Sequence, residues 1–200
     1  TAEEYRKITK NYPKVSKYIH YYNPDLQGPL PLCEALWGYE LYLDLYDEIE
    51  LVVDAFDYFT DLYIDFTKKW HSLCPPIDAE HSIEWGCLHK GHTIIRNDAA
   101  MNISGDMYCN LVKPRDEKII KVLGGGIHFC GKGDHYIKHV GDIEGLSCVN
   151  MSQPELNNMD TIYANTIDKD IIIFAMLTTE VDRAVSAGIN LKGRVSAGAS

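Results

Sequence analysis

The chain has 200 residues, with 19 Lys and Arg against 29 Asp and Glu, which gives a formal net charge of −10. With 46% hydrophobic and 24% charged residues, the composition is that of a globular chain and excludes a disordered one. The acid excess and the lack of a Lys/Arg run argue against nucleic acid or an anionic membrane surface as partner, because both need clustered positive charge. No apolar stretch approaches the roughly 20 residues of a membrane span, so we expect no membrane partner either.

Six cysteines occur, at positions 33, 74, 87, 109, 130 and 148. They could form disulfides, but no secretion signal opens the sequence and no C-x-x-C pair is present. We therefore expect reduced cysteines and a cytoplasmic location, and neither a zinc ribbon nor a thioredoxin motif.

The first third of the chain is expected to be mostly helical. Residues 1–16 favour a helix, residues 15–22 a strand, and the segment around Leu36 a short helix. The clearest helix covers residues 47–70, where apolar residues recur every three or four positions and acids stand at the start. Residues 80–92 contain three histidines and are expected to be a loop, either a lid or pocket wall or plain surface.

From residue 93 onward, strands and helices are expected to alternate. We predict strands over residues 93–95, 127–130, 146–149, 170–175 and 192–196, and helices over residues 104–122, 136–140, 152–167 and 179–187. The strands are short apolar runs without alternation, which is typical of a parallel sheet covered by helices. No Gly-x-Gly-x-x-Gly follows a strand, so a dinucleotide-binding fold has no support.

The fold class is therefore α/β, with a single domain over residues 1–200. These five strands and the one at residues 15–22 fall short of the eight that a closed (β/α)8 barrel needs. We expect a TIM-like barrel that is incomplete and lacks its N-terminal strands.

The residues that close each strand are the candidates for a site, because the active site of a parallel α/β barrel forms at the carboxyl ends of its strands. His128 and Cys130 stand two residues apart, so on a strand their side chains point to the same face. Imidazole nitrogen and thiolate sulfur are half of a zinc site. The third ligand is left open among Cys148, Cys87, His135 and Glu180, and a purely structural His and Cys is the alternative.

Asp98 follows the strand at residues 93–95 and is expected at the barrel mouth, where a carboxylate can accept a proton or hold a substrate N–H. It is the expected catalytic residue, and a loop aspartate that caps the next segment is the alternative. The expected substrate-binding residues are Arg96, Asn150, Gln153 and His135, which lie at or just beyond strand ends.

Residues 95–104, which read Ile-Arg-Asn-Asp-Ala-Ala-Met-Asn-Ile-Ser, resemble the uroporphyrinogen decarboxylase superfamily. So do Tyr108, Lys113-Pro114 and residues 125–131, which read Gly-Gly-Ile-His-Phe-Cys-Gly. The resemblance extends over residues 28–193 and implies that the chain is the C-terminal part of a TIM-like barrel.

The resemblance implies one of two chemistries. One branch of the family transfers methyl groups between a corrinoid protein and a thiol, with zinc held by His-x-Cys and a later Cys. His128 and Cys130 match that pair, whereas residues 178–200 contain no cysteine. The other branch decarboxylates the acetate side chains of the tetrapyrrole uroporphyrinogen without metal; Asp98 matches its aspartate, and Arg96 would hold carboxylates.

Zinc-dependent methyl transfer from a corrinoid to a small-molecule thiol is the first expectation, with a corrinoid protein as partner. Tetrapyrrole decarboxylation, in porphyrin biosynthesis, is the second. The third is a non-catalytic or truncated member of the family.

Overall fold

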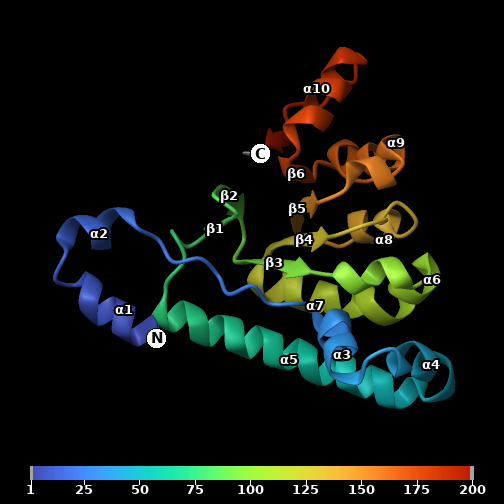
Figure 1. Cartoon of the computed structure of the whole chain (residues 1–200), viewed down its shortest axis with the longest axis horizontal. Coiled ribbons are helices and arrows are strands. Elements are labelled where there is room, and N and C mark those ends of the chain that lie inside the picture. Colours follow the sequence, from blue (N-terminus) through green and yellow to red (C-terminus); the bar gives the residue numbers. More distant parts are fainter. Residues whose placement is uncertain (1, 199–200) are drawn as a thin grey trace.

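A five-stranded parallel sheet forms the centre of the computed structural model, which describes residues 2–198 (Figure 1). Its strands are β3 (Thr93–Arg96), β4 (Gly125–Phe129), β5 (Leu146–Met151), β6 (Ile172–Met176) and β7 (Val195–Ala197). They lie side by side in sequence order, so the sheet does not reverse direction as a doubly wound sheet does. The α/β class is confirmed, while β3 and β7 are not paired with each other and the described strands form no closed barrel.

Helices flank this sheet and connect its strands. They are α7 (Lys113–Leu123), α8 (Ile137–Gly141), α9 (Met159–Ala164) and α10 (Thr178–Ser186). All residues of β3 and β4 are buried, which is typical of parallel strands covered on both faces. Gly126 allows β4 and β5 to approach closely, since a Cβ there would lie 2.4 Å from the Cys148 carbonyl oxygen. No helix within the described residues is long and apolar enough to cross a bilayer.

Two long predicted helices are interrupted in the structure. Residues 104–122 form α6 (Gly105–Met107), a π-helical turn η2 (Tyr108–Val112) and α7, and Ser104 caps the start as predicted by accepting from the Met107 N–H. Residues 152–167 form the 3₁₀ turn η3 (Pro154–Leu156) and α9, followed by the 3₁₀ turn η4 (Ile167–Lys169). The expected helix start at Ser152 is wrong, because Asn158 supplies the side-chain cap of α9.

The N-terminal half contains α1 (Ala2–Thr9), α2 (Pro13–Tyr18), α3 (Pro29–Trp37), α4 (Glu40–Asp47) and α5 (Ile49–Leu73). The predicted helix at residues 47–70 is confirmed as α5, which packs against α3 and α7. The predicted strand at residues 15–22 is wrong: Pro13 begins a second helix there, and the first helix stops at Thr9. Residue 1 lies outside the described residues.

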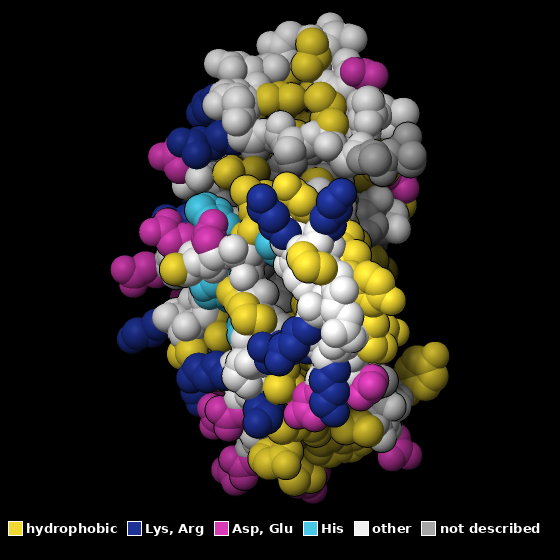
Figure 2. Space-filling model, turned by 90° about the vertical axis from the view of Figure 1, so that its left-hand side faces the viewer, with side chains coloured by type: hydrophobic (Ala, Val, Ile, Leu, Met, Phe, Trp, Pro, Cys, Tyr) yellow, Lys and Arg dark blue, Asp and Glu magenta, His cyan; other side chains and the backbone are white. Residues whose placement is uncertain are grey.

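Helices α1 and α2 project from the body of the molecule and bury none of their residues (Figure 1). Their basic side chains include Arg6, Lys7 and Lys17, although the whole chain is acidic. Figure 2 shows the face on which they lie, where Lys and Arg side chains stand among hydrophobic ones. Positive charge is therefore gathered at this end of the chain.

A β-hairpin replaces the loop expected at residues 80–92. Strands β1 (His81–Glu84) and β2 (Cys87–Lys90) are antiparallel, and Glu84 pairs with Cys87 across a two-residue turn. Both turn residues, Trp85 and Gly86, have positive φ, as a type I′ turn requires. Strand β2 contacts β5 and β6, and Cys87 packs against a small apolar cluster of Ile94, Cys148 and Phe174.

A buried polar network holds the turn that follows β3. The Asn97 N–H donates to the His128 carbonyl oxygen at 2.8 Å, and Asn97 Nδ2 donates to Asp116 Oδ2 at 2.6 Å. The Tyr108 hydroxyl also donates to Asp116 Oδ2, at 2.7 Å. Asp116 is fully buried, and burial raises its pKa from its ordinary value of 3.8 to about 7.

We expect the stability of the Asp116→Asn variant to lack the pH dependence that comes from titration of the Asp116 carboxyl group. Because the pKa is higher in the folded state, the stability due to Asp116 is present below pH 4 and is lost as the pH rises to 7. The free energy of unfolding of the wild type, relative to the variant, should fall by up to about 1.4 kcal/mol per pH unit in this window. Urea unfolding of both proteins between pH 4 and pH 8 tests this, and a pH-independent difference would contradict it.

Candidate metal centre

Three of the expected functional residues meet at the carboxyl ends of β3 and β4. His128 lies on β4, Cys130 follows that strand, and Asp98 opens the 3₁₀ turn η1 (Asp98–Asn102) directly after β3. The nearest ligand atoms of the three residues lie within 4.8 Å of one another. His128 Nε2 is 3.3 Å from Asp98 Oδ1 and 3.3 Å from Cys130 Sγ.

The hydrogen bonds of Asn150 determine which nitrogen of His128 faces the other two groups. Asn150 Nδ2 donates to the Phe174 carbonyl oxygen at 2.7 Å, and since a carbonyl only accepts, the orientation of the amide is set. Asn150 Oδ1 lies 2.6 Å from His128 Nδ1, so Nδ1 carries a hydrogen and donates it. Nε2 is the nitrogen left to face Asp98 and Cys130, which is how a metal-binding histidine is usually held.

The resulting group joins three potential ligand atoms: an imidazole nitrogen, a carboxylate oxygen and a sulfur. Three such atoms this close together are stabilised by a shared cation, either a proton on Nε2 or a metal ion. The hydrogen bond with His128 is the main reason why the pKa of Asp98 falls to about 2, so Asp98 is ionised at neutral pH. Burial raises the pKa of the Cys130 thiol, which would lose its proton on binding a metal.

Neighbouring groups orient Asp98 and Cys130. The Cys130 N–H donates to Asp98 Oδ1 at 3.1 Å, and Gln27 Nε2 donates to Asp98 Oδ2 at 3.3 Å. The Cys130 thiol lies 3.4 Å from Ser152 Oγ. The carboxylate and the thiol are thus held in place by the backbone and by side chains from two other segments.

Two of these three residues, Asp98 and His128, border a hollow of about 470 Å³ at this edge of the sheet. Asp98, His128, Asn150 and Ser152 line it, together with Trp85 from the tip of the β1–β2 hairpin. A volume of this size is within the range of small-molecule sites. The arrangement can hold a metal ion and a small ligand side by side.

Two of the four expected substrate-binding residues lie at the hollow. Asn150 lines it, but its amide is engaged with His128 and Phe174. Arg96 also lines it, yet its guanidinium forms ion pairs with Asp25 and, at 3.1 Å, with Glu84. Its charge is therefore already neutralised within the protein.

The other two expected substrate-binding residues lie outside this hollow. Gln153 Oε1 accepts from the Gly131 N–H at 2.6 Å and holds the loop after β4. His135 Nε2 lies 3.0 Å from the Ile103 carbonyl oxygen, and its ring packs edge-on against Tyr136. Both residues support the loops around the site and are not among its lining residues.

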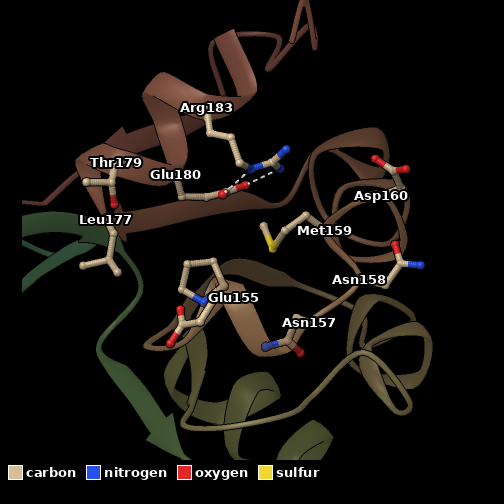
Figure 3. A pocket seen from close by; sticks show the side chains of 10 residues that line it. Glu155, Asn157, Asn158, Met159, Asp160, Leu177, Thr179, Glu180 and Arg183 are labelled. Atoms are coloured by element: carbon tan, nitrogen blue, oxygen red, sulfur yellow. Dashed lines mark hydrogen bonds and ion pairs between the residues drawn. The ribbon is translucent and has the colours of Figure 1, made fainter. Parts of the chain in front are cut away.

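The group of Asp98, His128 and Cys130 contains none of the four residues expected to supply the third ligand, and Asp98 lies in that place. Cys148 is buried in the apolar cluster that Cys87 packs against, and His135 is engaged elsewhere. Glu180 forms a bidentate ion pair with Arg183 in a second hollow of about 600 Å³, shown in Figure 3. Leu177 lines both hollows, so the two adjoin.

Sequence reasoning missed Gln27 and Ser152, and it did not single out Trp85, which lies in the segment expected to be a lid, a pocket wall or plain surface. The signal for Trp85 was available: Trp85-Gly86 separates two four-residue segments that can pair, but Trp-Gly is not among the usual type I′ sequences. Gln27 and Ser152 carry no local motif, because their contacts come from distant parts of the chain.

Comparison with protein-family models, curated proteins and solved structures found no match for this chain. The resemblance to the uroporphyrinogen decarboxylase superfamily therefore stays a prediction.

We expect the Asn150→Ala variant to bind zinc about 10- to 100-fold more weakly than the wild type, because the ring of His128 loses the acceptor that orients it. Competition with a chromophoric zinc chelator measures the two affinities. Asn190→Ala, at an exposed position far along the chain, is the matched control and should bind like the wild type. Equal affinities for all three proteins would show that Asn150 does not orient a ligand.

Proposed function

We propose that the chain is a zinc-dependent enzyme similar to the uroporphyrinogen decarboxylase superfamily, which transfers a methyl group from a corrinoid protein to a small-molecule thiol. The observation that supports it most is the group of Asp98, His128 and Cys130, with ligand atoms within 4.8 Å of one another. Nitrogen, sulfur and oxygen are the ligand atoms that Zn²⁺ takes, and three protein ligands leave one position free, as in catalytic zinc sites.

The residues around the group fit a zinc ion. Nδ1 of His128 donates to Asn150, so Nε2, which faces Asp98 and Cys130, is the nitrogen that a metal ion would bind. When bound, zinc would lower the pKa of a thiol that occupies the free position, which makes the thiol a better nucleophile. The chain itself orients the three residues, and two of them, Asp98 and His128, line the hollow, where a thiol has room.

The proposal includes a TIM-like (β/α)8 barrel of which the five-stranded sheet is one part. Three features support this: the strands follow sequence order, the functional side chains gather at their carboxyl ends, and Gln27 adds a parallel bridge to Arg96 at the outer side of β3. A cytoplasmic location is also part of the proposal, because all six cysteines are free thiols.

Tetrapyrrole decarboxylation is less well supported by the hollow. A tetrapyrrole with many carboxylates needs free cations, and Arg96 is the one Lys or Arg among the described lining residues. Its pairing with Asp25 and Glu84 leaves no charge for a substrate carboxylate. Asp98 would in addition be engaged by His128 and by the Cys130 N–H.

The zinc content of the purified protein tests the ligand set. We expect a stoichiometric amount of zinc in the wild type and a loss of most of it in Asp98→Ala, His128→Ala and Cys130→Ala, because each variant removes one ligand. Elemental analysis by inductively coupled plasma mass spectrometry measures this. Cys109→Ala, a thiol outside the group, is the control and should keep its zinc. Zinc retained in all three ligand variants would contradict the proposal.

Transfer activity tests the reaction itself. With methylcobalamin as donor, thiol-dependent demethylation should be measurable by its absorbance change, should disappear after removal of zinc with a chelator, and should return when zinc is added. His128→Ala should reduce the rate to background. A metal-free protein with full activity would contradict the proposed chemistry, and so would release of CO₂ from uroporphyrinogen.

A further inference from the structure

Trp85 stands at the tip of the β1–β2 hairpin in an unusual backbone conformation. Its φ is +46°, in the left-handed region that bulky side chains rarely adopt, and Gly86 follows with φ +75°. Conformations of this kind persist where surrounding contacts maintain them, and they are frequent at functional sites. The turn directs the indole toward the hollow beside the proposed metal ligands.

Contacts from three strands hold the indole. Its ring centroid lies 5.1 Å from that of His128 on β4, and 5.7 Å from that of Phe174 on β6, with which it stacks at 28°. The guanidinium carbon of Arg96 on β3 lies 4.8 Å from the indole centroid. Glu84, the residue before Trp85, pairs with Arg96 and ties the hairpin to the sheet.

Trp85 as a whole is nevertheless 44% exposed, so these contacts leave part of its surface open. That surface belongs to the lining of the hollow, together with Asp98 and His128. A fixed aromatic side chain with an open face offers a large apolar contact at little cost in side-chain entropy. The indole of Trp85 lies next to the position where the reacting atom of a substrate would be bound.

The charged residues around the hollow disfavour an anionic substrate group. Among its described lining residues, Arg96 is the one Lys or Arg, and it is paired with Asp25 and Glu84. Asp25 and Asp98 add negative charge. An anionic group on a substrate would therefore lose its hydration without gaining a free cation, whereas an apolar group gains contact with the indole and with Leu177.

We infer that the acceptor is a thiol with an apolar substituent, aromatic or branched alkyl, which packs against Trp85, and that carboxylated or sulfonated thiols are not preferred. Trp85 is then the specificity-determining residue of the site. The inference rests on the proposed function, because a metal ion held by Asp98, His128 and Cys130 would bind the thiol sulfur beside the indole.

Cobalt-loaded protein tests this inference directly, because a thiolate that binds Co²⁺ gives a charge-transfer absorption band. Three probes are titrated: phenylmethanethiol, 2-mercaptoethanol and 2-mercaptoethanesulfonate. The wild type should bind phenylmethanethiol roughly tenfold or more tightly than 2-mercaptoethanol, a typical effect of filling an apolar site. It should bind the sulfonate no more tightly than 2-mercaptoethanol.

Variants of the hairpin attribute the preference to the indole. Trp85→Ala should abolish the preference for phenylmethanethiol over 2-mercaptoethanol, measured as the ratio of the two affinities at saturating Co²⁺, whereas Trp85→Phe should retain most of it. Leu88→Ala, an exposed residue of the same hairpin that does not line this hollow, is the matched control and should behave like the wild type.

The outcomes separate this inference from the proposed function. Cobalt binding with equal affinity for the three thiols, a preference for the sulfonate, or an unchanged preference in Trp85→Ala would overturn the inference and leave the metal site standing. Failure of the protein to bind Co²⁺ at all would overturn both.

Discussion

Asn150 bridges two strands of the sheet, donating to the Phe174 carbonyl oxygen on β6 and accepting from His128 Nδ1 on β4. The proposed chemistry depends on this bridge, because it directs Nε2 of His128 toward Asp98 and Cys130. If the Asn150 amide could rotate, His128 could donate from either ring nitrogen. Its Nε2 would then not be held beside Asp98 and Cys130. The proposed metal ion needs all three at once, so the backbone carbonyl of Phe174 on β6 indirectly sets the orientation of His128 on β4.

The register of the parallel strands brings the residues of this site to one edge of the sheet. Arg96 at the end of β3 lies beside His128, and His128 lies beside Asn150, so the residues after these strands reach the same edge. Asp116 holds this edge in place by accepting a hydrogen bond from Asn97, the residue before Asp98. The hairpin covers the other side, where Trp85 contacts Arg96, His128 and Phe174.

Local patterns in the sequence predicted the five strands of the parallel sheet and the long helix α5, but not the hairpin of β1 and β2. The two-residue spacing of His128 and Cys130 likewise placed both on one face. Asp98 was expected at the same edge of the sheet, but its contact with this pair was not predictable, because Asp98 and Cys130 are 32 residues apart and meet only through the pairing of β3 with β4. The strand expected at residues 15–22 failed for a related reason: its apolar residues have no partner strand, and Pro13 begins a helix instead.

X-ray absorption spectroscopy at the zinc edge tests the central claim most directly, because it reports the atoms bound to the metal. If Asp98, His128 and Cys130 hold zinc, the spectrum will contain a single sulfur at about 2.3 Å, with the remaining ligands nitrogen or oxygen at about 2.0–2.2 Å. The imidazole will add the outer-shell scattering of its ring. A shell made of several sulfur atoms, or a protein that binds no zinc, would contradict the account.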